Sequence, residues 1–273
     1  MNSPKLRADD RGEPTDTTAG TLVPAGACAP AGTLAPSSRP AALVTGSAKG
    51  AGRAIVLALA EDGYDVAVHY RRSRDEAEAV AATAAGLGAR TAVLQADVRV
   101  EEQARGLVDA AHGAFGRLDV LVNNVGDYHQ GPLEELSGEV WRDMLASNLD
   151  STFYTCQQAV QYLPGGGGRI INIGYAGAEQ IKARPGIAAY GIAKTGVILY
   201  SKALARTLAA AGVTVNVVSP GVLENSVSQP IEEIPMRRLG RLAELVGAVR
   251  YLVSPEAAYV TGVTIEVAGG WNA

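Results

Sequence analysis

The sequence PAALVTGSAKGAGRAI, residues 40–55, joins an apolar run, a glycine-rich turn and the start of an amphipathic segment. The apolar residues 41–44 predict a buried strand, and the spacing from Ala54 onward is typical of a helix. A strand, a glycine turn and a helix in this order are the context of a dinucleotide fingerprint. Glycines there turn the chain and let the backbone approach a pyrophosphate, which the helix N-terminus attracts. We therefore interpret this stretch as a dinucleotide-binding turn and not as an ordinary strand–helix loop. The residues expected to contact the cofactor are Gly46, Ser47, Lys49, Gly50, Ala51 and Gly52.

The composition is that of a globular, weakly acidic chain. Its 273 residues, 47% of them hydrophobic and 19% charged, suit one large α/β domain. A net charge of −4 argues against a nucleic-acid or anionic-membrane partner. Cys28 and Cys156 have neither metal-ligand nor disulfide-framework spacing, so we expect no metal site and a reducing, cytoplasmic compartment. Apolar runs fall short of the ~18 residues of a membrane span.

Residues 1–39 differ from the rest of the chain. They are rich in Pro, Ala, Gly, Thr and Ser and have little apolar periodicity. Such a segment buries too little apolar surface to offset the entropy of ordering it. We therefore predict a disordered extension over 1–39 and a single domain over 40–273.

Strand-like and helix-like patterns alternate from residue 40 to the C-terminus. Near-continuous apolar strands alternating with helices predict an α/β fold of the Rossmann type, a doubly wound parallel sheet of about seven strands with helices on both faces. The expected strands are 42–45, 65–69, 90–95, 120–123, 169–173, 213–218 and 264–267. The expected helices are 53–61, 75–87, 100–115, 139–162, 189–211 and 242–252.

The end of the second predicted strand distinguishes between the two nicotinamide cofactors. An NAD site places an acid there for the ribose 2′-hydroxyl, whereas this chain reads HYRRS over 69–73. Arginine guanidinium groups suit a phosphate dianion. The alternative, a solvated basic helix start, is disfavoured because basic residues there oppose the helix dipole. We predict NADP(H), contacted by Tyr70, Arg71, Arg72 and Ser73 in addition to Lys49.

Two further strand ends carry polar residues that suit a cofactor. Asp97, followed by Val98, is placed to accept a hydrogen bond from the adenine amino group. Asp97 can equally cap the helix expected near Val100, and the two roles are compatible. Asn124 and Gly126 follow the fourth strand, where the backbone passes the ribose. We therefore add Asp97, Val98, Asn124 and Gly126 to the expected cofactor contacts.

Tyr190 and Lys194 are four residues apart and so share one face of a predicted helix. A phenol with a pKa of about 10 exchanges protons poorly at neutral pH, and a nearby ammonium favours its ionised form. With its pKa lowered in this way, Tyr190 can protonate an alkoxide that develops as hydride arrives. Lys194 is also placed to reach the nicotinamide ribose. Both are therefore expected to act in catalysis and in cofactor binding.

Taken together, these motifs resemble the short-chain dehydrogenase/reductase family over residues 40–273. They are Thr45-Gly46-x-x-x-Gly50-x-Gly52, Asn123-Asn124-Val125-Gly126, Asn148, Tyr190-x-x-x-Lys194 and Pro220-Gly221. The resemblance implies hydride transfer with a nicotinamide cofactor that Pro220 and Gly221 also contact. It implies Tyr190 as acid/base, Lys194 as ribose anchor and Asn148 as the residue holding a proton-relay water. Homodimers or homotetramers are usual in the family.

One departure from the family concerns the serine that normally follows the fifth strand and binds the substrate carbonyl. Between Thr155 and Thr195 the chain has neither serine nor threonine. Tyr175 aligns with the serine when the strands are matched, but it lies 15 residues before Tyr190, slightly more than is usual in the family. Either the Tyr175 phenol donates that hydrogen bond, or Tyr175 packs against the loop and the serine function is absent.

Two reactions tolerate this departure. One is carbonyl reduction with Tyr175 as donor, and the other is reduction of a C=N bond in an imine, iminium or pterin-like ring. Pteridine reductases of the family are similar at HYRRS and also lack the serine. We therefore expect an NADPH-dependent reductase of a small carbonyl or C=N substrate. The alternatives are an oxidative alcohol dehydrogenase and a catalytically silent NADP(H)-binding sensor or scaffold.

Overall fold

The computed structural model describes residues 38–226 and 228–271. The extension predicted over 1–39 lies outside these residues except for its last two. Of those two, Arg39 is attached to the domain, because its Nε donates to the Gly63 carbonyl at 2.7 Å and lies 3.8 Å from an Asp65 carboxylate oxygen.

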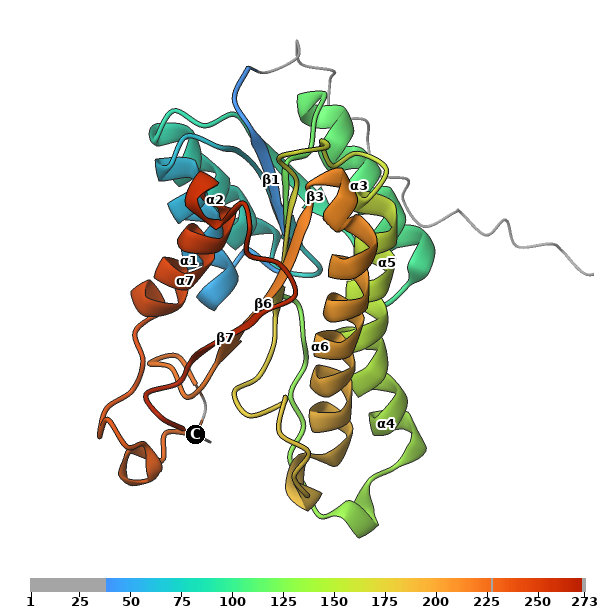
Figure 1. Ribbon diagram of the computed structural model, residues 1–273, viewed down its shortest axis with the longest axis vertical. Coiled ribbons are helices and arrows are strands. Elements are labelled where there is room, and N and C mark those ends of the chain that lie inside the picture. Colours follow the sequence, from blue (N-terminus) through green and yellow to red (C-terminus); the bar gives the residue numbers. More distant parts are fainter. Residues whose placement is uncertain (1–37, 227, 272–273) are drawn as a thin grey trace, which may run out of the picture.

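Within the described residues, seven parallel strands form one sheet, which confirms the predicted architecture (Figure 1). The sheet order is β3-β2-β1-β4-β5-β6-β7, so the order reverses between β1 and β4. Ligands of such sheets bind where the order reverses, at the carboxyl ends of the strands. The strands are β1 Ala41–Val44, β2 Asp65–Tyr70, β3 Thr91–Gln95, β4 Val120–Asn123, β5 Arg169–Ile173, β6 Thr214–Pro220 and β7 Thr264–Val267.

Helices cover both faces of the sheet (Figure 1). On one face lie α1 Gly50–Glu61, α2 Arg74–Gly86 and α7 Leu242–Val253; on the other lie α3 Glu101–Phe115, α5 Ser151–Ala159 and α6 Ala188–Leu208. Neighbouring residues of a strand point to opposite cores, so Val44 packs toward the first set and Leu43 toward the second. Both faces of the central strands are therefore buried, which explains why these strands are mostly apolar. The remaining helix is α4 Gly138–Leu145, and the shorter turns are Leu133–Glu135, Pro185–Ile187, Ala209–Ala211, Ile231–Glu233 and Pro255–Ala257.

The long helix predicted over 139–162 is interrupted. The chain forms α4, then the π-helical segment Ala146–Asp150, and then α5, which ends at Ala159. A π-helical turn adds a residue to the helical repeat, and apolar spacing does not reveal it. The segment contains Asn148, so the interruption changes the direction in which a predicted site residue points.

His69, at the end of β2, connects three strand ends. Its Nδ1 accepts from the Gly46 N–H at 2.8 Å, and its Nε2 therefore carries the proton and donates to the Ala96 carbonyl at 3.1 Å. The His69 N–H donates to Ser47 Oγ at 2.9 Å. Burial lowers the pKa of His69 to about 4, which keeps the ring neutral. The neutral ring fixes the first turn of the glycine loop.

A second buried network lies beneath the site. Asn123 Nδ2 donates to Asn172 Oδ1 at 2.9 Å, and Thr155 Oγ1 donates to Asn123 Oδ1 at 2.7 Å. Asn172 Nδ2 in turn donates to Ser201 Oγ at 2.8 Å. These bonds join β4 and β5 to α5 and α6, so they fix α6, which carries Tyr190 and Lys194.

The buried neutral His69 predicts a pH-dependent stability. The folded pKa of about 4 lies below the ordinary 6.5, so the unfolded chain binds more protons between these values. The contribution is complete above pH 6.5 and is lost as the pH falls toward 4. Over that window wild type should lose about 3 kcal/mol more unfolding free energy than His69→Asn. Urea unfolding at a series of pH values measures this, and parallel curves for the two proteins would contradict it.

Candidate active site

The glycine loop between β1 and α1 is shaped by close backbone contacts. Gly46 has a φ of +64°, and Gly50, where α1 begins, has a φ of +55°. A Cβ on Gly52 would lie 2.4 Å from the Gly46 carbonyl oxygen and 2.6 Å from Asn124 Nδ2. Asn124 Nδ2 also donates to the Thr45 carbonyl at 3.0 Å. A side chain is thus excluded at position 52. The first turn of α1, which contains Ala51, begins three residues earlier than the periodicity predicts.

The residues after β2 separate into buried and accessible groups. Tyr70 is buried in the core between the sheet and α1, so its side chain packs inside the domain. Arg71 and Ser73 are half-buried and Arg72 is exposed. Lys49 Nζ lies 2.6 Å from Glu76 Oε1 on α2. Two of the three predicted cations, Arg71 and Arg72, therefore remain at the sheet edge, while Lys49 is held in an ion pair.

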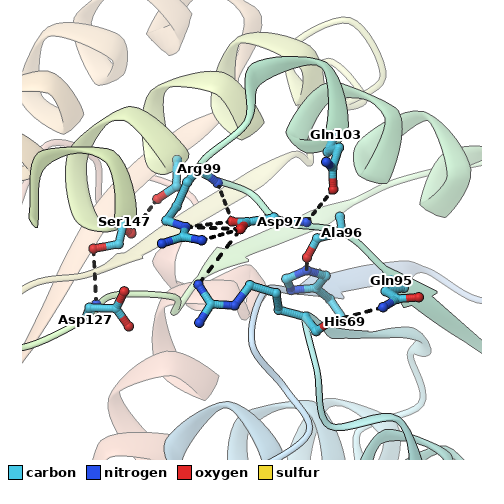
Figure 2. A network of polar contacts seen from close by, with 10 residues as sticks. His69, Gln95, Ala96, Asp97, Arg99, Gln103, Asp127 and Ser147 are labelled. Carbon is cyan, nitrogen blue, oxygen red and sulfur yellow. Dashed lines mark hydrogen bonds and ion pairs between the residues drawn. The ribbon is translucent and has the colours of Figure 1, made fainter. Parts of the chain in front are cut away.

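Asp97 and Val98 line a pocket of about 90 Å³ beside Gly46 and Arg71. The Asp97 carboxylate is bound by Arg99, whose Nε lies 2.9 and 3.1 Å from the two oxygens (Figure 2). The helix-cap role predicted for Asp97 is wrong, because Val100 occupies the N-cap of α3 and the carboxylate turns back to Arg99. The motifs did not predict a role for Arg99. The available signal was its place two residues after Asp97, a spacing at which the two side chains can form an ion pair.

Tyr190 and Lys194 share one face of α6 as predicted. Lys194 Nζ lies 5.8 Å from the centroid of the Tyr190 ring and donates to the Ile173 carbonyl at 2.8 Å. Burial lowers the pKa of Lys194 to about 8 and raises the pKa of Tyr190. The expected lowering of the phenol pKa is therefore absent from this structure, because the ammonium donates to a carbonyl and both groups are desolvated.

Asn148 faces the same space as Lys194. Its Nδ2 donates to the carbonyls of Asp127 and Met144, each at 3.0 Å, which directs Oδ1 the other way. Within the described residues Oδ1 is buried with no hydrogen-bond partner. A Cβ on Gly126 would lie 2.4 Å from this oxygen and 3.2 Å from Lys194 Nζ. Gly126 therefore leaves room beside both groups.

Two tyrosine rings pack edge-on against Tyr190. The Tyr175 centroid lies 5.4 Å from it and the Tyr128 centroid 5.0 Å. Tyr175 also lies beneath the Arg184 guanidinium, 5.9 Å from the ring centroid. The loop after β5 thus brings Tyr175 to the candidate reacting centre. The motifs did not indicate Tyr128, and its place two residues after the Asn-Asn-Val-Gly motif was the available signal.

Pro220 and Gly221 lie where β6 ends, beside the loop that carries Tyr175. The Ala176 N–H donates to the Pro220 carbonyl at 3.0 Å, and the Gly221 N–H donates to the Val267 carbonyl at 3.0 Å. A Cβ on Gly221 would lie 2.9 Å from Ala268. The glycine is required by this close packing, whatever contact it makes with a cofactor.

The arrangement fits a nicotinamide dinucleotide. Gly52 packs too closely against the Gly46 carbonyl to carry a side chain, arginine side chains line the pocket beside Gly46, and Asn148 Oδ1 is an unsatisfied acceptor beside Lys194. Across the described ranges, no cluster of three or more His, Cys, Asp or Glu side chains could hold a metal ion. In the same residues, no helix has the length and apolar character to cross a membrane.

Comparison with known proteins agrees with this geometry. A family model described as enoyl-(acyl carrier protein) reductase matches residues 46–272. The 3-oxoacyl-[acyl-carrier-protein] reductase FabG of Staphylococcus epidermidis is 38% identical over 240 residues, which cover 84% of this chain and 97% of that protein.

Two solved structures show the same fold. The blue fluorescent protein from a metagenomic library, in complex with NADPH, has a TM-score of 0.82 and 34% identity, covering 86% of this chain and 98% of its own. The short-chain dehydrogenase/reductase of Serratia marcescens has a TM-score of 0.81 and 35% identity with the same coverage. The chain belongs to the short-chain dehydrogenase/reductase family.

Proposed function

We propose that this oxidoreductase uses NADPH to reduce a small carbonyl or C=N substrate, with Tyr190 as the proton donor. The observation that carries the proposal is that Asn148 Oδ1 and Lys194 Nζ flank one space beside Gly126, while the Tyr190 ring centroid lies 5.8 Å from that Nζ. The cofactor is NADP(H): Arg71 and Arg72 stand where an NAD enzyme places an acid, and the blue fluorescent protein with this fold binds NADPH. When bound, the cofactor supplies the hydride.

Tyr190 holds the proton that the product alcohol or amine needs. Because burial raises its pKa, the phenol is protonated at neutral pH and can donate as negative charge develops on the substrate. Lys194, with a pKa of about 8, is mostly protonated at neutral pH. Its positive charge, 5.8 Å from the ring centroid, stabilises the phenolate that remains.

Asn148 completes the proton path. Its Oδ1 and Lys194 Nζ flank the same position beside Gly126, so a water bound there would accept from Nζ and donate to Oδ1. We assign this path to the resupply of the Tyr190 proton. The π-helical segment gives Asn148 the direction that the path needs.

Tyr175 is the proposed replacement for the missing serine. Its ring packs edge-on against Tyr190 with the two centroids 5.4 Å apart, and this proximity supports the proposal. The first substrate class to test is the 3-oxoacyl thioester, because a curated relative is named for that reaction. Absence of the serine favours a C=N substrate as the second candidate, since no carbonyl oxygen then requires a donor.

We also propose a homodimer or homotetramer in the cytoplasm. Phe153 on α5 and Ile192 and Leu199 on α6 are large apolar side chains that are exposed in the single chain. Burial of such side chains in a subunit interface is favourable.

Removal of the Tyr190 hydroxyl tests the proton donor. Tyr190→Phe should lower kcat by about 10²–10⁴-fold and leave NADPH affinity intact, because the ring and Lys194 remain. Tyr200→Phe is the matched control, a tyrosine on the same helix whose hydroxyl accepts from Gln157 at 3.2 Å. Steady-state kinetics and fluorescence titration measure both quantities. A Tyr190→Phe enzyme with wild-type turnover would disprove the assignment.

Removal of the Tyr175 hydroxyl tests the carbonyl donor. Tyr175→Phe should lower kcat/KM for a ketone by about a hundredfold, the cost of one transition-state donor, and leave a cyclic imine unaffected. Tyr128→Phe, which also retains a ring against Tyr190, is the control and should have little effect on either substrate. If ketone reduction survives in Tyr175→Phe, the phenol does not replace the serine.

Arg71 is expected to bind the 2′-phosphate directly. Arg71→Ala should weaken NADPH binding by about tenfold while NADH binding changes little, because a charge-assisted contact is lost only with the phosphate. Arg74→Ala is the control, since Arg74 is exposed and paired with Glu78 at 2.7 Å. Dissociation constants from titration decide between the outcomes, and equal losses for both cofactors would rule out this role.

A further inference from the structure

Arg99 makes a two-pronged contact with Asp97 in the pocket beside the glycine loop. Its Nε lies 2.9 Å from Oδ1 and its Nη2 lies 2.5 Å from Oδ2 (Figure 2). The Arg99 N–H also donates to Oδ1 at 3.1 Å, so backbone and side chain hold the same carboxylate. The two side chains are 29% and 22% exposed, which limits screening by solvent. This is a fixed, partly buried ion pair.

Arg71 competes for the same carboxylate. Its Nη1 lies 3.9 Å from Asp97 Oδ2, at the outer limit of an ion pair, whereas Arg99 is in direct contact with that oxygen. A carboxylate occupied by Arg99 attracts Arg71 less strongly. The Arg71 guanidinium is thereby left with its charge available to another anion.

The charges around the pocket balance only because Arg99 is present. The residues that line the pocket include two arginines, Arg71 and Arg99, and two acids, Asp97 and Asp127. The pKa of Arg99 is raised by its bond to Asp97 and by the charges of Asp127 and Asp143. Without Arg99, one cation would face two acids in the pocket, and a doubly charged phosphate would be repelled.

From these contacts we infer that Arg99 determines specificity for the 2′-phosphate by neutralising Asp97. The inference rests on the proposed use of NADP(H) and deepens it, because it assigns cofactor choice to a residue outside the basic segment that follows β2. Asp97 then serves the adenine as an acceptor without acting as the acid that an NAD site requires. Arg99 acts through Asp97 and Arg71, so it is a positioning residue.

The test measures the binding of two cofactor fragments, 2′,5′-ADP and 5′-AMP. They differ only in the 2′-phosphate, which 5′-AMP lacks. Calorimetric titration of the full chain gives both dissociation constants without any turnover. Arg99→Gln should weaken the binding of 2′,5′-ADP by about tenfold and the binding of 5′-AMP much less. The reason is that the freed Asp97 carboxylate both repels the phosphate and pairs with Arg71. The control is Arg105→Gln on α3, whose guanidinium pairs with Glu101 at 2.8 Å.

A second substitution distinguishes this account from a direct or merely structural role. In Arg99→Gln with Asp97→Asn, the acid is gone and the preference for 2′,5′-ADP over 5′-AMP should return to near the wild-type value, because any change in the adenine contact of residue 97 affects both fragments. Failure of this rescue, or equal weakening of both fragments by Arg99→Gln, would overturn the inference. If wild type itself does not prefer 2′,5′-ADP over 5′-AMP, the proposed NADP(H) use fails first. Wild-type preference with no effect of Arg99→Gln defeats the inference alone.

Discussion

The structure depends on a backbone contact that only glycine permits. At the end of β1 the chain turns so tightly that a side chain on Gly52 would meet the Gly46 carbonyl at 2.4 Å. The turn is held from both sides, by His69 on the Gly46 N–H and by Asn124 on the Thr45 carbonyl. The strand ends β2 and β4 are thus fixed to β1, and the helix N-terminus opens onto the space between them. This turn therefore positions the candidate cofactor contacts of the glycine loop.

A second glycine at a tightly packed position shapes the candidate reacting centre. Gly126 leaves room between Asn148 and Lys194, and the π-helical segment turns Asn148 toward it. Burial shapes the acid–base properties more than the Tyr190–Lys194 pairing does, since it raises the phenol pKa and lowers the ammonium pKa. A buried, protonated phenol suits reduction, where the enzyme must deliver a proton. The ring of Tyr175 packs edge-on against Tyr190 at this centre.

Much of this could be predicted from the sequence because it depends on local periodicity. The seven strands, the two helix layers and the shared face of Tyr190 and Lys194 follow from apolar spacing and helical repeat. What escaped depends on contacts between distant segments. His69 binds residues 23 and 27 positions away, and no spacing rule indicates that. The Arg99–Asp97 ion pair, which forms in place of the predicted helix cap by Asp97, depends on how the chain turns after β3. The π-helical segment depends on a single added residue in the helical repeat.

The central claim, a reductase that uses NADPH, is tested most directly by cofactor consumption. Wild-type protein would be incubated with NADPH and, separately, a 3-oxoacyl thioester, a simple ketone and a cyclic imine, with NADH in parallel. The account predicts that NADPH is oxidised only when one of these substrates is present, and faster than NADH. Tight binding of NADPH without its oxidation by any carbonyl or C=N compound would contradict the account and favour a cofactor-binding sensor or scaffold.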